Sequence, residues 1–200
     1  MKKIYILLSS IALLVLLAAG FLLLDFHIAH SQNRINSSVS TYATSLQKGE
    51  KLPPNQPLVV YVAGSGALAS AFRQELVQRL QASPEFGNVK LHGSPIETMD
   101  QPVLRVEIVR EAVTWTPLYG KASPTFQVAF ASDGDVTWRN MGTVFMPNDM
   151  GQVVRLQGTF DQVDSTYGLL SQPAYMRLLS ESAAEQIVKS LSNALERPAG

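Results

Sequence analysis

The chain has 200 residues, 16 basic and 16 acidic side chains, three histidines and no cysteine. The lack of cysteine excludes disulfides, thiolate metal sites, a cysteine nucleophile and lipid attachment at an N-terminal cysteine. The balanced charge supplies no basic surface for a nucleic acid, and the composition suits one globular domain with an appendage.

The N-terminal segment, residues 1–30, contains the run IYILLSSIALLVLLAAGFLLL, which has no charged side chain. A helix of this length would cross a hydrocarbon core of about 30 Å. Lys2 and Lys3 precede the run and Asp25 follows it, so the positive-inside bias predicts a single-pass anchor in a bacterial inner membrane with the rest of the chain extracytoplasmic. The alternative is a signal peptide cleaved near Ser31.

Residues 31–57 are rich in serine and end in proline, which is typical of a linker between two parts of a chain. Four apolar residues recur in it at helical spacing: Ile35, Val39, Tyr42 and Leu46. A helix with this stripe would form a homodimer through a short coiled-coil seam. The alternative is a solvated linker helix.

The third part, residues 58–200, predicts the order β-α-β-β-β-β-α. Residues 58–63 form a buried strand, and a helix follows Ser65 with one apolar face made of Leu68, Phe72, Leu76 and Leu80. Alternating apolar residues predict strands in residues 102–115, 125–131 and 153–160, after a short strand near Val89. Residues 133–135, Asp-Gly-Asp, suit a hairpin turn.

A final helix opens at Pro173 and carries a long apolar stripe: Tyr175, Leu179, Ala183, Ile187, Leu191 and Leu195. These elements predict an α+β fold, a two-layer sandwich of a mainly antiparallel sheet with two helices on one face, preceded by the transmembrane helix.

The stretch VAGSGALASAF, residues 62–72, matches the G-x-G-x-x-A spacing of dinucleotide-binding turns. The second predicted strand, however, ends Leu91-His92-Gly93 and supplies no acidic residue for a ribose. We therefore interpret the glycines as a tight strand-to-helix turn in which Ser65 caps the helix, and we expect no cofactor.

Catalytic and metal sites have little support in the sequence. His27 and His30 follow the apolar segment and fit interfacial polar residues better than ligands, and His92 has no evident triad partner. Asp161 and Asp164 could form a carboxylate pair for glycan or lipid hydrolysis, with a solvated loop as the simpler interpretation. We expect no metal site and a protein that is not an enzyme.

Two predicted loops carry aromatic and methionine side chains of the kind used at adaptable contact surfaces. We predict contact with a partner protein or a lipid through these residues: Trp115, Leu118, Tyr119, Val144, Phe145 and Met146. The alternative is that they fold back into the core.

The last predicted helix opens at Pro173-Ala174-Tyr175 and continues through Leu179, Ile187 and Leu191. With this helix, the order of predicted elements resembles that of small periplasmic envelope-transport lipoproteins. The two families are the LPS-assembly lipoproteins and the auxiliary lipoproteins of ABC-type lipid transporters. This chain departs from both because it has no cysteine to carry the lipid. The resemblance implies a non-catalytic accessory subunit of an envelope assembly or lipid-transport complex; a structural, oligomerising protein is a further alternative.

Overall fold

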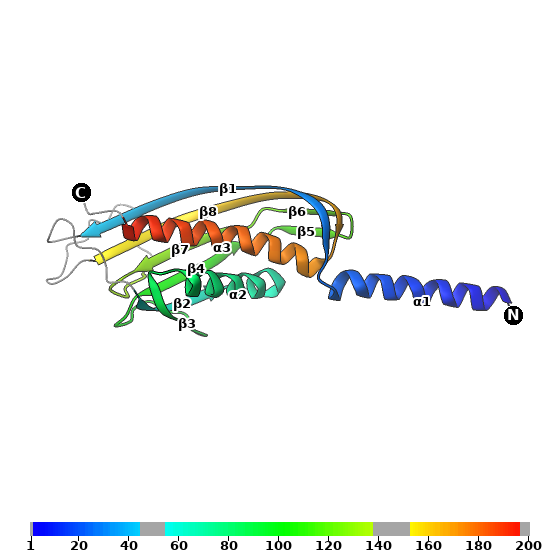
Figure 1. Ribbon diagram of the computed structural model, residues 1–200, viewed down its shortest axis with the longest axis horizontal. Helices are drawn as coiled ribbons and strands as arrows, with labels where there is room; N and C mark the ends of the chain where they lie inside the picture. Colours follow the sequence, from blue (N-terminus) through cyan, green and yellow to red (C-terminus); the bar gives the residue numbers. More distant parts are fainter. Residues whose placement is uncertain (1, 45–54, 138–152, 197–200) are drawn as a thin grey trace.

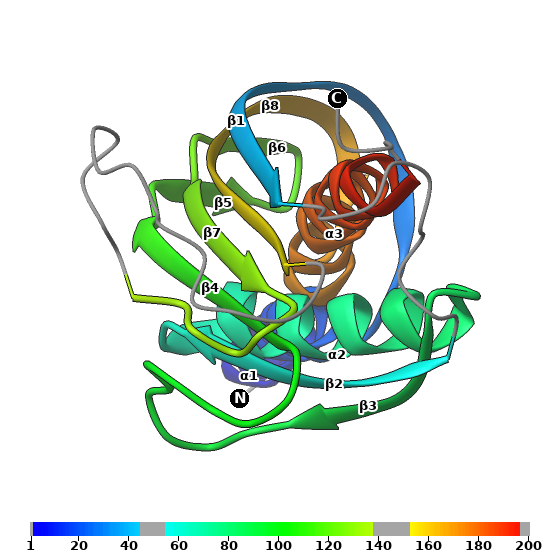
Figure 2. The same cartoon turned by 90° about the vertical axis from the view of Figure 1, so that its left-hand side faces the viewer.

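The computed structural model describes residues 2–44, 55–137 and 153–196. These residues form a strongly curved sheet that holds two helices in its concave face, and a third helix projects from one end (Figures 1 and 2). The elements follow in the order α1 (Lys2–Leu23), β1 (His27–Thr44), β2 (Gln56–Ala63), α2 (Gly66–Ala82), β3 (Phe86–Leu91), β4 (Val103–Arg110), β5 (Val113–Thr116), β6 (Tyr119–Ala122), β7 (Thr125–Ala131), β8 (Val153–Leu170) and α3 (Gln172–Glu196).

The sheet is mixed rather than mainly antiparallel. Its order is β3-β2-β4-β7-β8-β6-β5, and β1 pairs with β8 on the other side. Strand β2 runs parallel to both β3 and β4, while the remaining pairs are antiparallel. The α2 helix connects the parallel strands β2 and β3, as parallel strands require a crossover connection. The predicted α+β class is therefore found, with this different sheet.

Helices α2 and α3 pack as their apolar periodicity predicts. The apolar face of α2 is fully buried and consists of Leu68, Phe72, Leu76 and Leu80. Five of the six stripe residues of α3 have exposed fractions of at most 1 %. Leu195, the sixth, is partly buried and packs against the same core. Most of these side chains form the main core together with apolar residues of β2, β4, β7 and β8, and the rings of Phe72 and Phe126 lie 4.8 Å apart in it. Leu68, Tyr175 and Leu179 belong to a second core cluster.

Helix α1 corrects the prediction of a membrane anchor. Roughly 20 consecutive, mainly apolar residues are needed for a helix to span a hydrocarbon core. Among the residues that the structure describes, no helix is both long and apolar enough to do so. The predicted transmembrane helix is therefore wrong, and so is the localisation that depended on it, a single-pass inner-membrane protein with its C-terminal domain extracytoplasmic.

Strand β1 replaces the predicted linker and linker helix over residues 31–44. It pairs antiparallel with β8 along its whole length, from His27 opposite Leu170 to Thr44 opposite Val153. Ile35 and Val39 are four positions apart, so they also share one face of a strand, and both pack against the main core. Pairing with β8 thus overrides a helical spacing that spans few residues; Leu46 lies outside the described residues.

The glycine turn joins β2 to α2, as predicted. Gly64 and Gly66 have φ of 144° and 90°, which a residue with a side chain rarely adopts. Ser65 occupies the N-cap position but its hydroxyl makes no capping hydrogen bond, so the predicted cap is wrong in that respect. The guanidinium of Arg73 instead donates to the carbonyl oxygens of Val62 and Gly64 and thereby ties the helix to the strand end.

Candidate contact surface

The predicted contact residues that the structure describes all belong to the β5–β6 hairpin. Trp115 lies on β5, Tyr119 begins β6 and Leu118 lies in the turn between them. Val144, Phe145 and Met146 lie outside the described residues. The hairpin and the start of β1 lie at the end of the domain to which α1 is attached (Figure 1).

Backbone hydrogen bonds fix the hairpin turn against the last residues of β8. The amides of Gly168 and Leu170 donate to the carbonyl oxygens of Leu118 and Pro117, both at 3.0 Å. Gly168 has φ of 128°, and a Cβ there would lie 2.6 Å from the carbonyl oxygen of Ile28. Only glycine therefore lets β1, β8 and the turn approach so closely.

Trp115 has a structural role in this arrangement. Its side chain is partly buried and packs against a second core cluster that contains Leu170 and Leu179. Its indole Nε1 donates to the carbonyl oxygen of Leu170 at 3.1 Å. A buried indole needs such a partner, so this residue holds the hairpin rather than presenting a free contact group.

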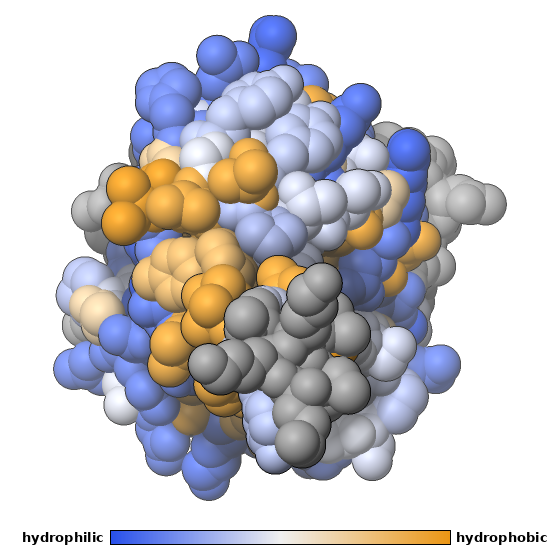
Figure 3. Space-filling view, turned by 90° about the vertical axis from the view of Figure 1, so that its right-hand side faces the viewer, coloured by the Kyte–Doolittle hydropathy of each residue, from blue (hydrophilic) through white to orange (hydrophobic). Residues whose placement is uncertain are grey.

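Three exposed apolar side chains of β1 and β8 lie on the outer, convex face of this end, and Leu118 lies in the adjacent turn. Together these residues define the outer apolar cluster: Ile28, Leu118, Tyr167 and Leu169. Their exposed fractions are 73, 63, 57 and 43 %. Ile28 lies directly opposite Leu169 in the β1–β8 ladder, and the ring of Tyr167 lies 5.0 Å from that of Tyr119. Figure 3 views this end along α1, and the apolar side chains that gather there include those of the projecting α1.

A buried polar network lies on the opposite, concave side of the same strands. The carboxylate of Asp164, fully buried, accepts hydrogen bonds from the hydroxyls of Ser31 at 2.6 Å, Thr166 at 2.8 Å and Tyr175 at 3.0 Å. Desolvation and, after it, the Asp164 carboxylate raise the pKa of the Tyr175 hydroxyl far above its usual value. The network joins β1, β8 and α3 behind the outer apolar cluster.

Gly120 shows how tightly β6 packs on this network. A Cβ at this position would lie 2.6 Å from Cζ of Tyr175, a distance that van der Waals contact forbids. Glycine therefore allows the backbone of β6 to rest on the tyrosine ring. This contact sets the position of the hairpin that carries Leu118 and Tyr119.

The two candidate catalytic aspartates do not form a pair. Asp161 is exposed and accepts a hydrogen bond of 2.7 Å from the Thr125 hydroxyl, whereas Asp164 is buried in the network described above. They are three positions apart on one strand, so they point to opposite faces of the sheet. They cannot act on one substrate from the same side.

The remaining candidates have structural or solvent-exposed positions. His27, His30 and His92 are exposed, and the described residues include no group of three His, Cys, Asp or Glu side chains that could hold a metal. The predicted Asp133-Gly134-Asp135 turn is present, and Arg155 of β8 pairs with both of its aspartates. Gly134 allows this turn to approach the carbonyl oxygen of Met99.

A groove of about 860 Å³ lies between the first turns of α2 and α3. Most of its lining residues are polar, among them Gln74, Gln78, Gln172 and the ion pair between Arg177 and Asp25. Small-molecule sites are usually apolar with few polar groups, so this groove is a weaker candidate than the outer apolar cluster.

Comparison with known proteins yields solved structures alone. No family model matches the chain, and no curated protein matches it. One similar structure is a PelC dodecamer from Paraburkholderia phytofirmans, with 15 % identity and a TM-score of 0.35; the match covers 80 % of this chain and 99 % of that chain. Another is a putative neuraminyllactose-binding hemagglutinin homolog from Helicobacter pylori, with 13 % identity and a TM-score of 0.37; the match covers 77 % of this chain and 90 % of that chain. Neither is described as an LPS-assembly lipoprotein. At these TM-scores the likeness carries no argument about function.

Proposed function

We propose that the protein acts by binding rather than catalysis, as an accessory subunit of an envelope assembly or lipid-transport complex, and that its contact site is the outer apolar cluster. The observation that supports this proposal is the exposure of Ile28, Leu118, Tyr167 and Leu169 together at one end of the sheet. Exposed apolar groups from separate segments that form one patch are typical of interaction sites.

The support beneath the cluster strengthens the proposal. Three elements carry the cluster: β1, β8 and the β5–β6 turn. The Asp164 network and the backbone bonds of Gly168 and Leu170 hold those elements in fixed positions. A rigid scaffold lowers the entropic cost of binding, because the contact groups are ordered before the partner arrives.

The proposal is tested with a photocrosslinking amino acid at Leu118 in one variant and at Tyr167 in another. The crosslinking is carried out in cells that produce the protein. We expect covalent adducts with a protein or a lipid at both positions, identified by mass spectrometry. The matched control is Val109, which is also apolar and half exposed but lies near the end of β4, outside the cluster. Adduct yields at Leu118 and Tyr167 no higher than at Val109 would contradict the proposed site.

A further inference from the structure

Strand β1 lies at an edge of the sheet for its whole length. It contains 18 residues, and its pairing with β8 runs without a register shift. No strand among the residues that the structure describes pairs with its second edge. Main-chain donors and acceptors thus line that edge over roughly 60 Å, at about 3.3 Å per residue.

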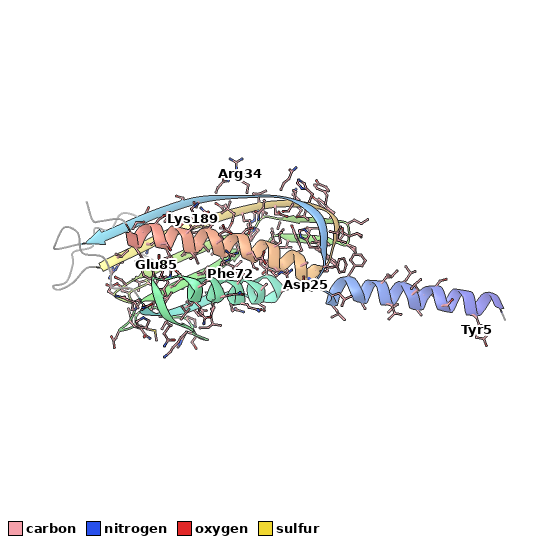
Figure 4. The ribbon with its side chains drawn as sticks, viewed as in Figure 1. Tyr5, Asp25, Arg34, Phe72, Glu85 and Lys189 are labelled. Atoms are coloured by element: carbon pink, nitrogen blue, oxygen red, sulfur yellow. The ribbon has the colours of Figure 1, made fainter. Side chains whose placement is uncertain are left out.

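The other edges of the sheet are protected and β1 is not. Proteins protect edge strands by making them short, by placing lysine or proline on them, or by a bulge. Strand β3 has six residues, one of which is Lys90, and β5 has four residues. Strand β1 has no lysine, proline or bulge, and its one charged residue other than histidine is Arg34, which projects away from the sheet (Figure 4).

We propose that β1 of one chain pairs antiparallel with β1 of a second copy of this chain, so that two sheets join about a two-fold axis near Asn36. Directly opposite residues of an antiparallel pair lie on the same side of the sheet. In two identical strands they are therefore both even-numbered or both odd-numbered, and their residue numbers add up to an even number. Nearly complete overlap of two strands spanning His27–Thr44 then places the axis at Ile35 or at Asn36.

Polar complementarity favours a second copy as the occupant, because the one arginine of β1 would face a neutral side chain that can form hydrogen bonds. With the axis at Ile35, Arg34 faces Asn36 of the partner; with the axis at Asn36, it faces Ser38. In neither register does the arginine lie directly opposite its own copy. With the axis at Ile35 the two arginines are diagonal neighbours, so like-charge repulsion favours the axis at Asn36. The neighbouring outward residues, Gln32 and Ser40, are neutral hydrogen-bonding groups that pair well across strands.

This pairing differs from a dimer through a helical stripe. Ile35 and Val39 remain in the core of their own chain, and the contact uses the backbone of β1 and polar side chains. An isologous pair of edges closes on itself, because each chain uses its one long edge. The expected product is therefore a dimer and not a fibre.

Analytical ultracentrifugation of the full chain, in a mild detergent that keeps the exposed apolar residues of α1 dispersed, tests the proposal. We expect a dimer at micromolar concentration. The double substitution Asn36→Lys/Ser38→Lys places a positive charge opposite Arg34 in either register and should weaken dimerisation about tenfold or more. An unchanged circular dichroism spectrum of the variant shows that the fold is retained.

The matched control is Gln74→Lys/Gln78→Lys, which adds the same charge at two exposed positions of α2. The control should remain a dimer. A monomeric wild-type chain, a dimer that persists after substitution in β1, or equal weakening by the control would each overturn the proposal.

Cysteine crosslinking gives an independent measurement, because the natural chain has no cysteine. A short bismaleimide should crosslink Asn36→Cys into a covalent dimer, since the two positions are facing or diagonal neighbours in the two registers. Gln74→Cys should give little product. Equal crosslinking at both positions would indicate collision of chains rather than a β1 interface.

Discussion

The two halves of β8 lie in the same sheet but bury opposite kinds of side chain. In the first half, next to β7, the inward residues are apolar and include Leu156 and Phe160. In the second half, most of which lies next to β6, they are the polar Gln162, Asp164 and Thr166, followed by the apolar Leu170 at the strand end. An apolar core gains stability from burial with little directional preference, whereas a buried polar network stabilises only the arrangement that satisfies its hydrogen bonds. The polar half is the half that supports the outer apolar cluster.

Truncation in the apolar half should have the largest effect on stability. Phe160 is fully buried in the main core, so Phe160→Ala should lower the free energy of unfolding by about 3 to 5 kcal/mol. Urea denaturation followed by circular dichroism measures this change. A loss below about 1 kcal/mol would show that this half of β8 does not carry the main core.

Removal of the central carboxylate should have the next largest effect. Asp164→Ala leaves the hydroxyls of Ser31, Thr166 and Tyr175 without their acceptor and should cost about 2 to 3 kcal/mol. Asp161→Ala, the control on the exposed face of the same strand, should change stability by no more than about 0.5 kcal/mol. Equal effects of the two substitutions would remove the contrast between the buried and exposed aspartates.

The Tyr175 hydroxyl should give a smaller effect that depends on pH. Tyr175→Phe removes one hydrogen bond to a carboxylate and should cost about 1.5 to 3 kcal/mol at neutral pH. Because the folded state raises the pKa of this tyrosine, the unfolded chain loses its proton first, at about pH 10, and wild-type stability falls as the pH rises further.

The phenylalanine variant should lose this part of the pH dependence. Melting temperatures of both proteins between pH 8 and about pH 11 measure the difference, because the two proteins differ only at this residue. Parallel curves would show that Tyr175 is not shielded in the folded state.

The smallest effect on stability is expected at the outer apolar cluster itself. Leu118 is mostly exposed, so Leu118→Ser should change the free energy of unfolding by no more than about 0.5 kcal/mol. The same substitution should reduce the photocrosslinking yield at Tyr167. A stable variant with an undiminished photocrosslinking yield at Tyr167 would show that Leu118 is not part of the contact site.

The candidate site was predictable only in part. Leu118 and Tyr119 stand out in the sequence because aromatic and apolar residues flank a proline turn. Ile28, Tyr167 and Leu169 do not, because single apolar residues on strands are normal and their meeting depends on register. Asp164 stands out in the sequence only as a carboxylate, because its burial and its hydrogen bond from Ser31 depend on the pairing of β1 with β8.

Local periodicity determined the helices α2 and α3, the alternation of β4, β7 and β8, and the glycine turn before α2, because each depends on residues a few positions apart. The tertiary structure alone decided that residues 27–44 form a strand, that β2 lies between parallel neighbours and that one half of β8 encloses a polar network. These features depend on pairing between segments separated by many residues, and such pairing leaves no periodic trace in either segment taken alone.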